Sequence, residues 1–379
     1  MLVLLLVTIQ PPSPIQASRD IVAATNQHVS DAVLCASQYN LKVQPRSGGH
    51  SYGSYGTGGK DGVMVIDLQR FQSVSLDYET NVATFGPGLR LGNLKLELRP
   101  TGRALPHGTC ANVGAGGHFA IGGDGFTTRA YGLAIDSLLG VDVVLANGSV
   151  VHATSTEYKD VFPAGSSFGI ATTFYAQTYA YPKTLTGIYL TWPGLPGNTE
   201  QSMLKGIYLG PVKTFNKTVL PELLRGLLSP GAGDSDSPTY VKDAIAYPKP
   251  GGSGYAPAPD HDNFYTKSIT VPAPEPPATA IRNLVALQGD VDNQVLLDSK
   301  SGLSAFWRRD TTWVMENSVF TSGPDEVFPV PAGIGLVSDL NRQVTGVLGA
   351  GNYGAYQGSD YDVSRKRYHT QQATPGIVA

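Results

Sequence analysis

The period of the apolar positions changes several times in the first half of the chain. Val29, Ala32, Val33 and Cys35 recur with helical spacing, which predicts a helix over Gln27–Gln38 whose core face includes Cys35. Three β-rich runs bounded by Gly, Asp or Asn follow and predict strands: Val63–Leu68, Gln72–Leu76 and Asn81–Phe85.

A second helix and a hairpin complete this pattern. Leu91–Leu98 has a helical pattern that ends at Arg99-Pro100. Val141–Leu145 and Ser149–Ala153 flank Asn147-Gly148, a dipeptide that favours a tight turn between two strands. Helices and paired strands mix without strict alternation, and this is typical of an α+β fold.

The pattern of the sequence changes near Tyr181. Longer segments follow, with Pro-rich interruptions at Tyr247–Pro259 and Val271–Pro277. We therefore expect a first domain over residues 18–180, a second over 181–345 and a C-terminal segment over 346–379. Residues 1–17 are a candidate signal or shortened N-terminus. The apolar run Met1–Ile9 is too short to span a bilayer, fits a signal-peptide core and predicts a secreted protein with no membrane partner.

Composition excludes several classes. The chain has 41% hydrophobic residues and a net charge of −3, whereas disordered chains are poor in apolar residues and rich in net charge. No block of Lys and Arg supplies the basic footprint that nucleic-acid binding needs. Only Cys35 and Cys110 are present, so no disulfide framework is predicted.

Glycine is concentrated in two stretches that also contain reactive side chains. Seven glycines lie in Arg46–Gly62 and eight in Gly108–Gly132, together with His50 and Cys110. Without Cβ atoms the backbone can approach a phosphate or a flat ring closely. The phosphate-binding P-loop motif is absent because Ser54 and Asp61 stand at required positions, and a dinucleotide-binding GxGxxG motif from Gly114 ends on Phe119. Neither common nucleotide motif accounts for these stretches.

The motifs Arg46–Gly53, His107–His118 and Gly122–Gly125 resemble the flavin domain of berberine-bridge-enzyme-like oxidases, and within that family most resemble the fungal oligosaccharide oxidases. The resemblance implies a two-subdomain PCMH-type FAD-binding domain and a substrate domain with an antiparallel sheet flanked by helices. It further implies FAD attached through His50 to the 8α-methyl group and through Cys110 to C6. The other cofactor-binding residues that it implies are Arg46, Ser47, Gly48, Gly49, Ser51, Tyr52, Gly108, Thr109, Val113, Gly114, Ala115, Gly116, Gly117, His118, Gly122, Gly123, Gly125, Gly169 and Ile170.

The family resemblance also implies a reaction. A monomeric oxidase would oxidise the C1 hydroxyl of a mono- or oligosaccharide and pass electrons to O2, with Ala115 as the small residue that leaves oxygen access. Near the C-terminus Ser359 aligns with the family's catalytic base, and Tyr361 replaces it after a two-residue shift. Asp298, in a segment resembling a family strand, would support that base. The C-terminal segment would return to the flavin site.

Three alternatives stay open. His107, Cys110 and His118 have a spacing usable for zinc, although zinc would not explain the glycine density; we expect no metal. The substrate could instead be an alkaloid, phenolic or other secondary metabolite. A third alternative is a degenerate, non-catalytic relative that binds flavin or sugar. Between Phe162 and Gly165 the chain lacks a family segment, and after Arg365 it lacks the family's closing helix, so we expect a shortened chain.

Overall fold

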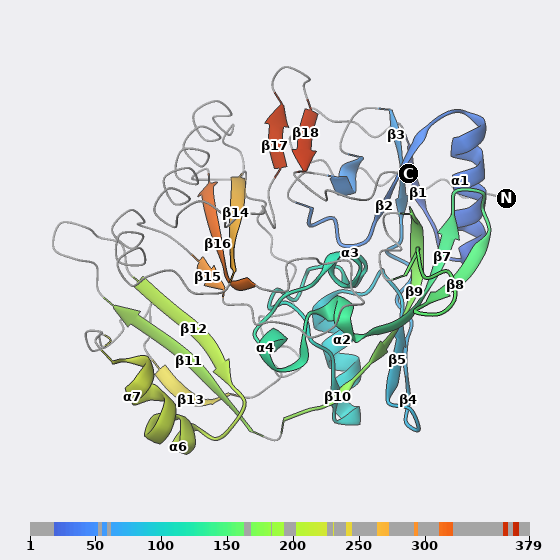
Figure 1. Cartoon of the computed structure of the whole chain (residues 1–379). Helices are drawn as coiled ribbons and strands as arrows, with labels where there is room; N and C mark the ends of the chain where they lie inside the picture. The colour runs from blue at the N-terminus through green and yellow to red at the C-terminus, as the bar shows by residue number, and fades with distance from the viewer. Residues whose placement is uncertain are drawn as a thin grey trace.

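The computed structural model places two groups of sheets along one chain (Figure 1). It describes residues 19–51, 55–58, 62–162, 168–182, 184–192, 202–225, 230, 240–244, 264–272, 292–294, 311–320, 359–362 and 367–370. Mixed helices, parallel strands and antiparallel strands confirm the α+β class predicted from the sequence.

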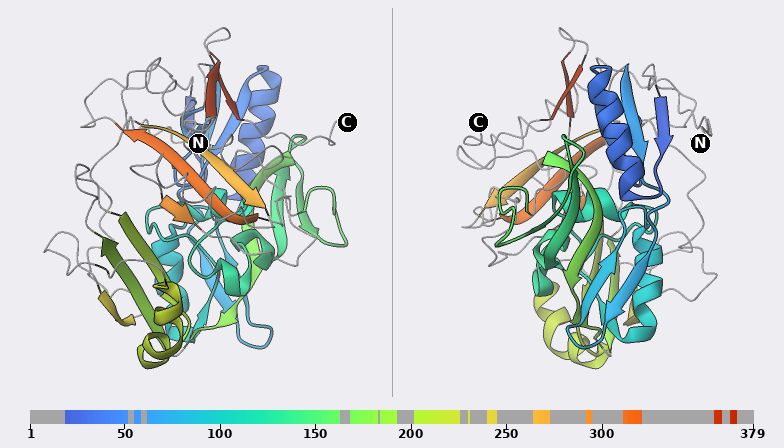
Figure 2. Two further views of the ribbon diagram at one scale, coloured as in Figure 1. Left: turned by 60° about the vertical axis from the view of Figure 1, so that its left-hand side comes forward. Right: turned by 90° about the vertical axis from the view of Figure 1, so that its right-hand side faces the viewer.

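A small parallel sheet begins the fold. Strand β3 (Val63–Asp67) lies between β1 (Arg19–Val22) and β2 (Lys42–Arg46), and both neighbours run parallel to it. Helix α1 (Asn26–Gln38) makes the crossover from β1 to β2, and the Thr25 hydroxyl caps it by accepting the His28 N–H at 3.2 Å. Figure 2 shows α1 beside these strands. The three parallel strands all end at the edge where the first glycine-rich stretch starts, since Ser47 follows β2 directly.

An antiparallel sheet forms the centre of the first half. Its order is β4-β5-β9-β7-β8, so that β9 joins two hairpins that are far apart in sequence. The strands span Val74–Asp77 (β4), Val82–Phe85 (β5), Leu138–Leu145 (β7), Val150–Thr154 (β8) and Gly169–Gln177 (β9). A separate two-stranded ladder joins Arg103–Ala104 (β6) to Tyr179–Ala180 (β10).

Helices cover this sheet and bury its apolar face. The main core packs Phe85, Phe119 and Phe174 together, with ring centroids 4.9 Å apart for Phe85 and Phe119. A second core joins α1 to both sheets and includes Val144 and Ile170. The covering segments are α2 (Leu91–Leu98), a 3₁₀ turn (Arg99–Thr101), α3 (Ala115–Ile121), α4 (Thr128–Tyr131) and a 3₁₀ turn (Ala134–Ser137); a further 3₁₀ turn spans Tyr55–Thr57.

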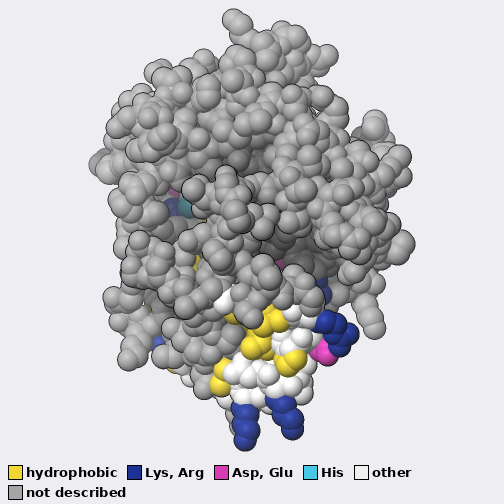
Figure 3. Space-filling model, turned by 90° about the vertical axis from the view of Figure 1, so that its left-hand side faces the viewer, with side chains coloured by type: hydrophobic (Ala, Val, Ile, Leu, Met, Phe, Trp, Pro, Cys, Tyr) yellow, Lys and Arg dark blue, Asp and Glu magenta, His cyan; other side chains and the backbone are white. Residues whose placement is uncertain are grey.

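The second half contains smaller described sheets. Strand β11 (Leu185–Trp192) pairs with β12 (Ser202–Tyr208) and β13 (Tyr240–Ala244), all antiparallel. The helical segments Val212–Thr214 (α6), Phe215–Val219 (a π-helix) and Leu220–Leu223 (α7) pack on this sheet through Phe215. Figure 3 shows basic and apolar side chains together at this end. The remaining strands are Phe264–Pro272 (β14), Asp292–Gln294 (β15) and Thr311–Phe320 (β16) in the order β14-β16-β15, and Ser359–Asp362 (β17) paired with Arg367–Thr370 (β18).

The predicted elements are present, with local differences. Helix α2 has the predicted bounds, and strand β5 starts after Asn81 because Asn81 adopts a φ of 58°, which suits a turn and not a strand. The prediction for Cys35 is wrong, since this side chain is exposed. The buried stripe of α1 runs through Val29, Ala32, Val33 and Ala36, and Cys35 lies outside it.

Candidate functional site

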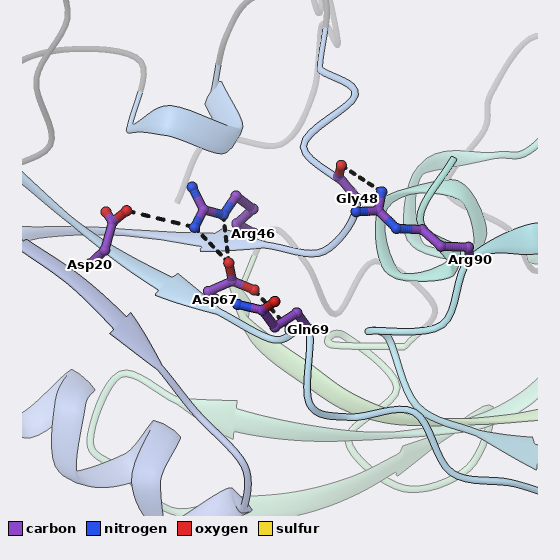
Figure 4. Close-up of polar contacts among 6 residues, drawn as sticks. All are labelled: Asp20, Arg46, Gly48, Asp67, Gln69 and Arg90. Carbon is purple, nitrogen blue, oxygen red and sulfur yellow. Dashed lines mark hydrogen bonds and ion pairs between the residues drawn. The ribbon is translucent and has the colours of Figure 1, made fainter. Parts of the chain in front are cut away.

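The first glycine-rich stretch, Arg46–Gly62, is called the first loop here, and it starts from an ion-paired arginine. Arg46 ends β2 and donates from Nε and Nη2 to Asp67 Oδ2 at 2.8 and 2.6 Å, and Nη2 lies 3.6 Å from Asp20 Oδ2 (Figure 4). The other oxygen of Asp67 accepts the Gln69 N–H at 2.8 Å. The Arg46 side chain thus anchors β2 to β3 and β1.

Ser47 connects this loop to the second glycine-rich stretch, Gly108–Gly132, which is called the second loop. Its hydroxyl donates to the Pro87 carbonyl at 2.5 Å and accepts the Gly116 N–H at 3.1 Å. Gly116 lies in α3, and a Cβ atom built there would come within 2.8 Å of the Ser47 Cβ. The side chain of Ser47 therefore holds the start of α3 against the loop that follows β2.

The two loops touch through glycine backbones. A Cβ on Gly48 would lie 2.3 Å from the Gly114 nitrogen, and a Cβ on Gly114 would lie 2.3 Å from the Gly48 nitrogen. Arg90 Nη1 donates to the Gly48 carbonyl at 2.6 Å and to the Asn112 carbonyl at 2.8 Å. Only residues without side chains permit this contact.

Two histidines shape the second loop. The Gly108 N–H donates to His118 Nε2 at 2.9 Å, and His107 Nδ1 lies 2.6 Å from the Gly108 carbonyl, to which it can only donate. Burial lowers the pKa of both imidazoles to about 4, with a smaller contribution from Lys95 at His107 and from His107 at His118. Both rings are neutral at pH 7, as the acceptor role of His118 Nε2 requires.

A carboxyl group beside these histidines has the opposite shift. Burial raises the pKa of Asp124 to about 6, and hydrogen bonds from Thr128 and Gly125 reduce that rise. The Asp124 backbone also packs on Gly108, where an added Cβ would lie 3.1 Å from the Asp124 oxygen. At pH 7 the two imidazoles are therefore neutral, whereas the Asp124 carboxyl is mostly ionised.

The reactive side chains lie on the accessible side of these loops. His50 follows Gly48 by two residues, Cys110 precedes Asn112 by two, and both are exposed. Gly49 has a φ of 74°, and a Cβ on Gly117 would meet nothing within 4 Å. Two nucleophilic side chains beside bare backbone fit a large planar cofactor.

The other predicted residues are spread over the loops and the core. Ser51 and Thr109 are exposed, Gly122 and Gly123 are buried, and Gly125 packs on the His107 carbonyl. Val113 is half-buried against the main core, and Ala115 is fully buried within it, so its role in oxygen access stays a prediction. Gly169 packs on Val143, and the Ile170 side chain lies in the second core, where only backbone atoms could meet a ligand.

Only one of the two residues predicted to be catalytic lies among the described residues. Tyr361 lies in β17, opposite Tyr368 in the register with β18. Asp298 and Tyr52 lie outside the described residues. The segment Val295–Asp298 is outside the described residues, and the preceding strand, β15, ends at Gln294.

Sequence reasoning missed the residues that hold the loops together. Arg90 and Asp67 make their contacts across 42 and 21 residues of sequence, respectively, and carry no motif of their own. The available signal was a charged residue within a run of buried strand residues for Asp67, and a charged residue directly before a predicted helix for Arg90.

The zinc alternative finds no support in the described part of the chain. There, no three His, Cys, Asp or Glu side chains gather closely enough to hold a metal ion. Of the proposed ligands, His118 uses its Nε2 to accept a backbone hydrogen bond from Gly108. Among the described helices, none has both the length and the apolar character needed to cross a bilayer.

Comparison with known proteins agrees with the cofactor assignment. Residues 17–154 match the family described as FAD binding domain. A chitooligosaccharide oxidase of Gibberella zeae is 30% identical over 90% of this chain and 79% of its own length. A xylooligosaccharide oxidase of Thermothelomyces thermophilus is 38% identical over 67% of this chain. That match spans only 58% of the relative's length.

A solved structure adds the type of flavin attachment. The glucooligosaccharide oxidase of Acremonium strictum, whose FAD is described as 6-S-cysteinyl and 8α-N1-histidyl, aligns with a TM-score of 0.73 and 25% identity over 88% of this chain and 80% of its own. The fold is accordingly the PCMH-type FAD-binding fold. The chain belongs to the family of FAD-linked oxidases that includes the berberine-bridge-like enzymes and the fungal oligosaccharide oxidases.

Proposed function

We propose that this chain binds FAD covalently through His50 and Cys110 and oxidises the C1 hydroxyl of a mono- or oligosaccharide to the lactone, while O2 is reduced to H2O2. The observation that carries the proposal is the contact of the two loops at Gly48 and Gly114, which leaves both nucleophiles exposed. The oligosaccharide oxidases named above support the substrate class.

Each residue has a separate role in this proposal. Imidazole and thiolate are nucleophiles able to bond to an electron-poor ring, and flanking glycines let that ring approach the backbone. When bound, the flavin supplies the acceptor for a hydride from the sugar C1. Tyr361, ionised to the phenolate, takes the hydroxyl proton on its phenolic oxygen and becomes a neutral phenol, and Asp298 supports Tyr361 as the base.

The proposal extends to the organisation of the chain. We assign the flavin domain to residues 18–180, the substrate domain to 181–345 and the returning C-terminal segment to 346–379. We also assign a monomer that is secreted. The candidate signal in residues 1–17 lies outside the described residues. Gel filtration of the holoenzyme and N-terminal sequencing of protein from culture medium test these two assignments.

Absorption and oxygen uptake test the function directly. Flavin absorbance that stays with acid-precipitated protein is expected, and soluble colourless protein contradicts the proposal. Peroxide formed with oligosaccharides supports the sugar oxidase. Peroxide formed only with aromatic alcohols or amines assigns the secondary-metabolite alternative, and none from either class assigns the degenerate one.

The catalytic base has its own test. Tyr361→Phe is expected to lower turnover by roughly 100-fold or more with flavin content unchanged, because it removes the proton acceptor. Tyr368→Phe, at the position opposite Tyr361 in β18, is the matched control and should keep turnover. If Tyr361→Phe keeps wild-type turnover and Ser359→Ala loses it, the base is Ser359.

A further inference from the structure

Arg90 lies where the two loops meet, and the backbone around it is hydrogen-bonded to the second loop. Leu91 N–H, at the start of α2, donates to the Val113 carbonyl at 2.9 Å, and Ala115 N–H donates to the Leu89 carbonyl at 2.8 Å. Arg90 itself forms an antiparallel bridge with Gly114. These bonds on both sides of Arg90 fix its Cα against the segment that follows Cys110.

The Arg90 side chain then reaches the first loop. A single nitrogen, Nη1, donates one hydrogen to the Gly48 carbonyl at 2.6 Å (Figure 4) and the other to the Asn112 carbonyl at 2.8 Å. Gly48 precedes His50 by two residues, and Asn112 follows Cys110 by two. One guanidinium thus bridges two carbonyls, and each of these carbonyls lies two residues from one of the two nucleophiles.

The packing around the guanidinium leaves little freedom. A Cβ on Gly48 would lie 2.7 Å from Arg90 Nη1, so the guanidinium packs directly against Gly48. Burial lowers the pKa of Arg90, with Asp67 opposing and Arg46 adding to this shift, but guanidinium stays charged at every physiological pH. Hydrogen bonds from a charged donor are stronger than those between neutral groups.

We propose that Arg90 is a positioning residue that sets the spacing of His50 and Cys110 for attachment to the same flavin. This inference rests on the proposed double attachment. Without the bridge the loops still meet through the Ser47–Gly116 hydrogen bond and the Gly48–Gly114 contact. What is lost is the side chain that holds the Gly48 and Asn112 carbonyls, each two residues from a nucleophile, in a fixed position relative to each other. One nucleophile can then still bond to the flavin while the second is misplaced.

Tryptic mapping of the holoenzyme tests the proposal. Cleavage after Arg46 and Lys60 releases the peptide with His50, and cleavage after Arg103 and Arg129 releases the peptide with Cys110. In the wild type, one flavin should join both peptides. In Arg90→Met, the joined fraction should fall roughly tenfold in favour of peptides with a single attachment, as expected for the loss of a charge-assisted hydrogen bond.

The control is an arginine that bonds elsewhere in the same domain. Arg103 donates to the Thr178 hydroxyl at 2.9 Å and to its carbonyl at 2.5 Å, and Arg103→Met should keep the wild-type joined fraction. Its Cys110 peptide then begins after Lys95, because the variant lacks the cleavage site at residue 103 and Pro100 blocks cleavage after Arg99. A wild-type joined fraction in Arg90→Met, or in Arg90→Gln if the Met variant is insoluble, overturns the inference. Insolubility of both variants beside soluble Arg103→Met assigns Arg90 to folding and overturns it as well. A wild type without covalent flavin refutes the proposed function instead.

Discussion

The two glycine-rich loops are held by different chemistry. Arg46, at the base of the first, is fixed by two carboxylates, Asp67 and Asp20. The second is held around Gly108 by the neutral rings of His107 and His118. A guanidinium keeps its charge and its hydrogen-bond donors at every physiological pH, whereas an imidazole that accepts a hydrogen bond loses that role on protonation. The loops that form one site should therefore fail under different conditions.

The largest effect is expected where the loops touch. In Gly48→Ala the added Cβ meets backbone atoms of Gly114 that cannot rotate away, so we expect a loss of about 4 kcal/mol or more in the free energy of unfolding. Urea unfolding and flavin content measure it. Gly206→Ala in β12 is the control, since its Cβ would meet only Ile188 Cδ1 at 3.7 Å. Equal stability of the two variants would show that the loops are not in contact.

The ion-paired anchor of the first loop is expected to come next. Arg46→Met leaves the Asp67 carboxylate, whose side chain is 6% exposed, without its partner, at a cost of about 3 kcal/mol. Arg225→Met removes an ion pair with Glu222 at the surface and should cost less than about 0.5 kcal/mol. Denaturant unfolding at pH 7 compares them. An Arg46→Met variant as stable as Arg225→Met would mean that the loop does not depend on this pair.

The anchor of the second loop should weaken in acid. The pKa values of His107 and His118 fall from 6.5 to about 4 on folding, so their contribution is complete above pH 6.5 and is lost as the pH falls to 4. Asp124, whose pKa rises to about 6, acts in the opposite direction between pH 6 and 3.8. Two imidazoles outweigh one carboxyl, and we expect a net loss of about 2 kcal/mol because all three groups keep some contact with water.

Single variants separate these contributions. His118→Asn retains an acceptor for the Gly108 N–H but does not titrate, so the slope of stability between pH 6.5 and 4 should become shallower. Asp124→Asn should make the slope steeper. The melting temperature in that pH range measures both, and the wild type provides the reference slope. Unchanged slopes in both variants would contradict the difference between the loops.

Local elements were within reach of sequence reasoning because their signals are local. Leu91–Leu98 forms a helix with the predicted bounds, since apolar spacing and the following Arg99-Pro100 define it. Cys35 was misplaced because it neighbours the stripe Val29, Ala32, Val33 and Ala36 without belonging to it.

The site was only partly predictable. The glycines with His50 and Cys110 indicated a cofactor loop, because their residue types are unusual together. The roles of Arg90 and Asp67 depend on contacts that form only after the parallel sheet and the start of α2 have come together. A side chain that binds backbone carbonyls far away in sequence has no signature in its own neighbours. The cofactor role of Arg46 stays a prediction, and its ion pairs with Asp67 and Asp20 are a further set of contacts that the motif did not indicate.

The smallest effect should come from a glycine without contacts. Gly117 is exposed within α3, and a Cβ there meets nothing within 4 Å, so Gly117→Ala should raise the stability of flavin-free protein by about 0.5–1 kcal/mol. Gly116→Ala, one residue earlier, would press on Ser47 and Pro87 and should lower it. If Gly117 faces the cofactor, its Ala variant must also take up less flavin. Higher stability with full flavin content would remove Gly117 from the cofactor site and leave Gly48 and Gly114 as glycines required by the loop contact itself.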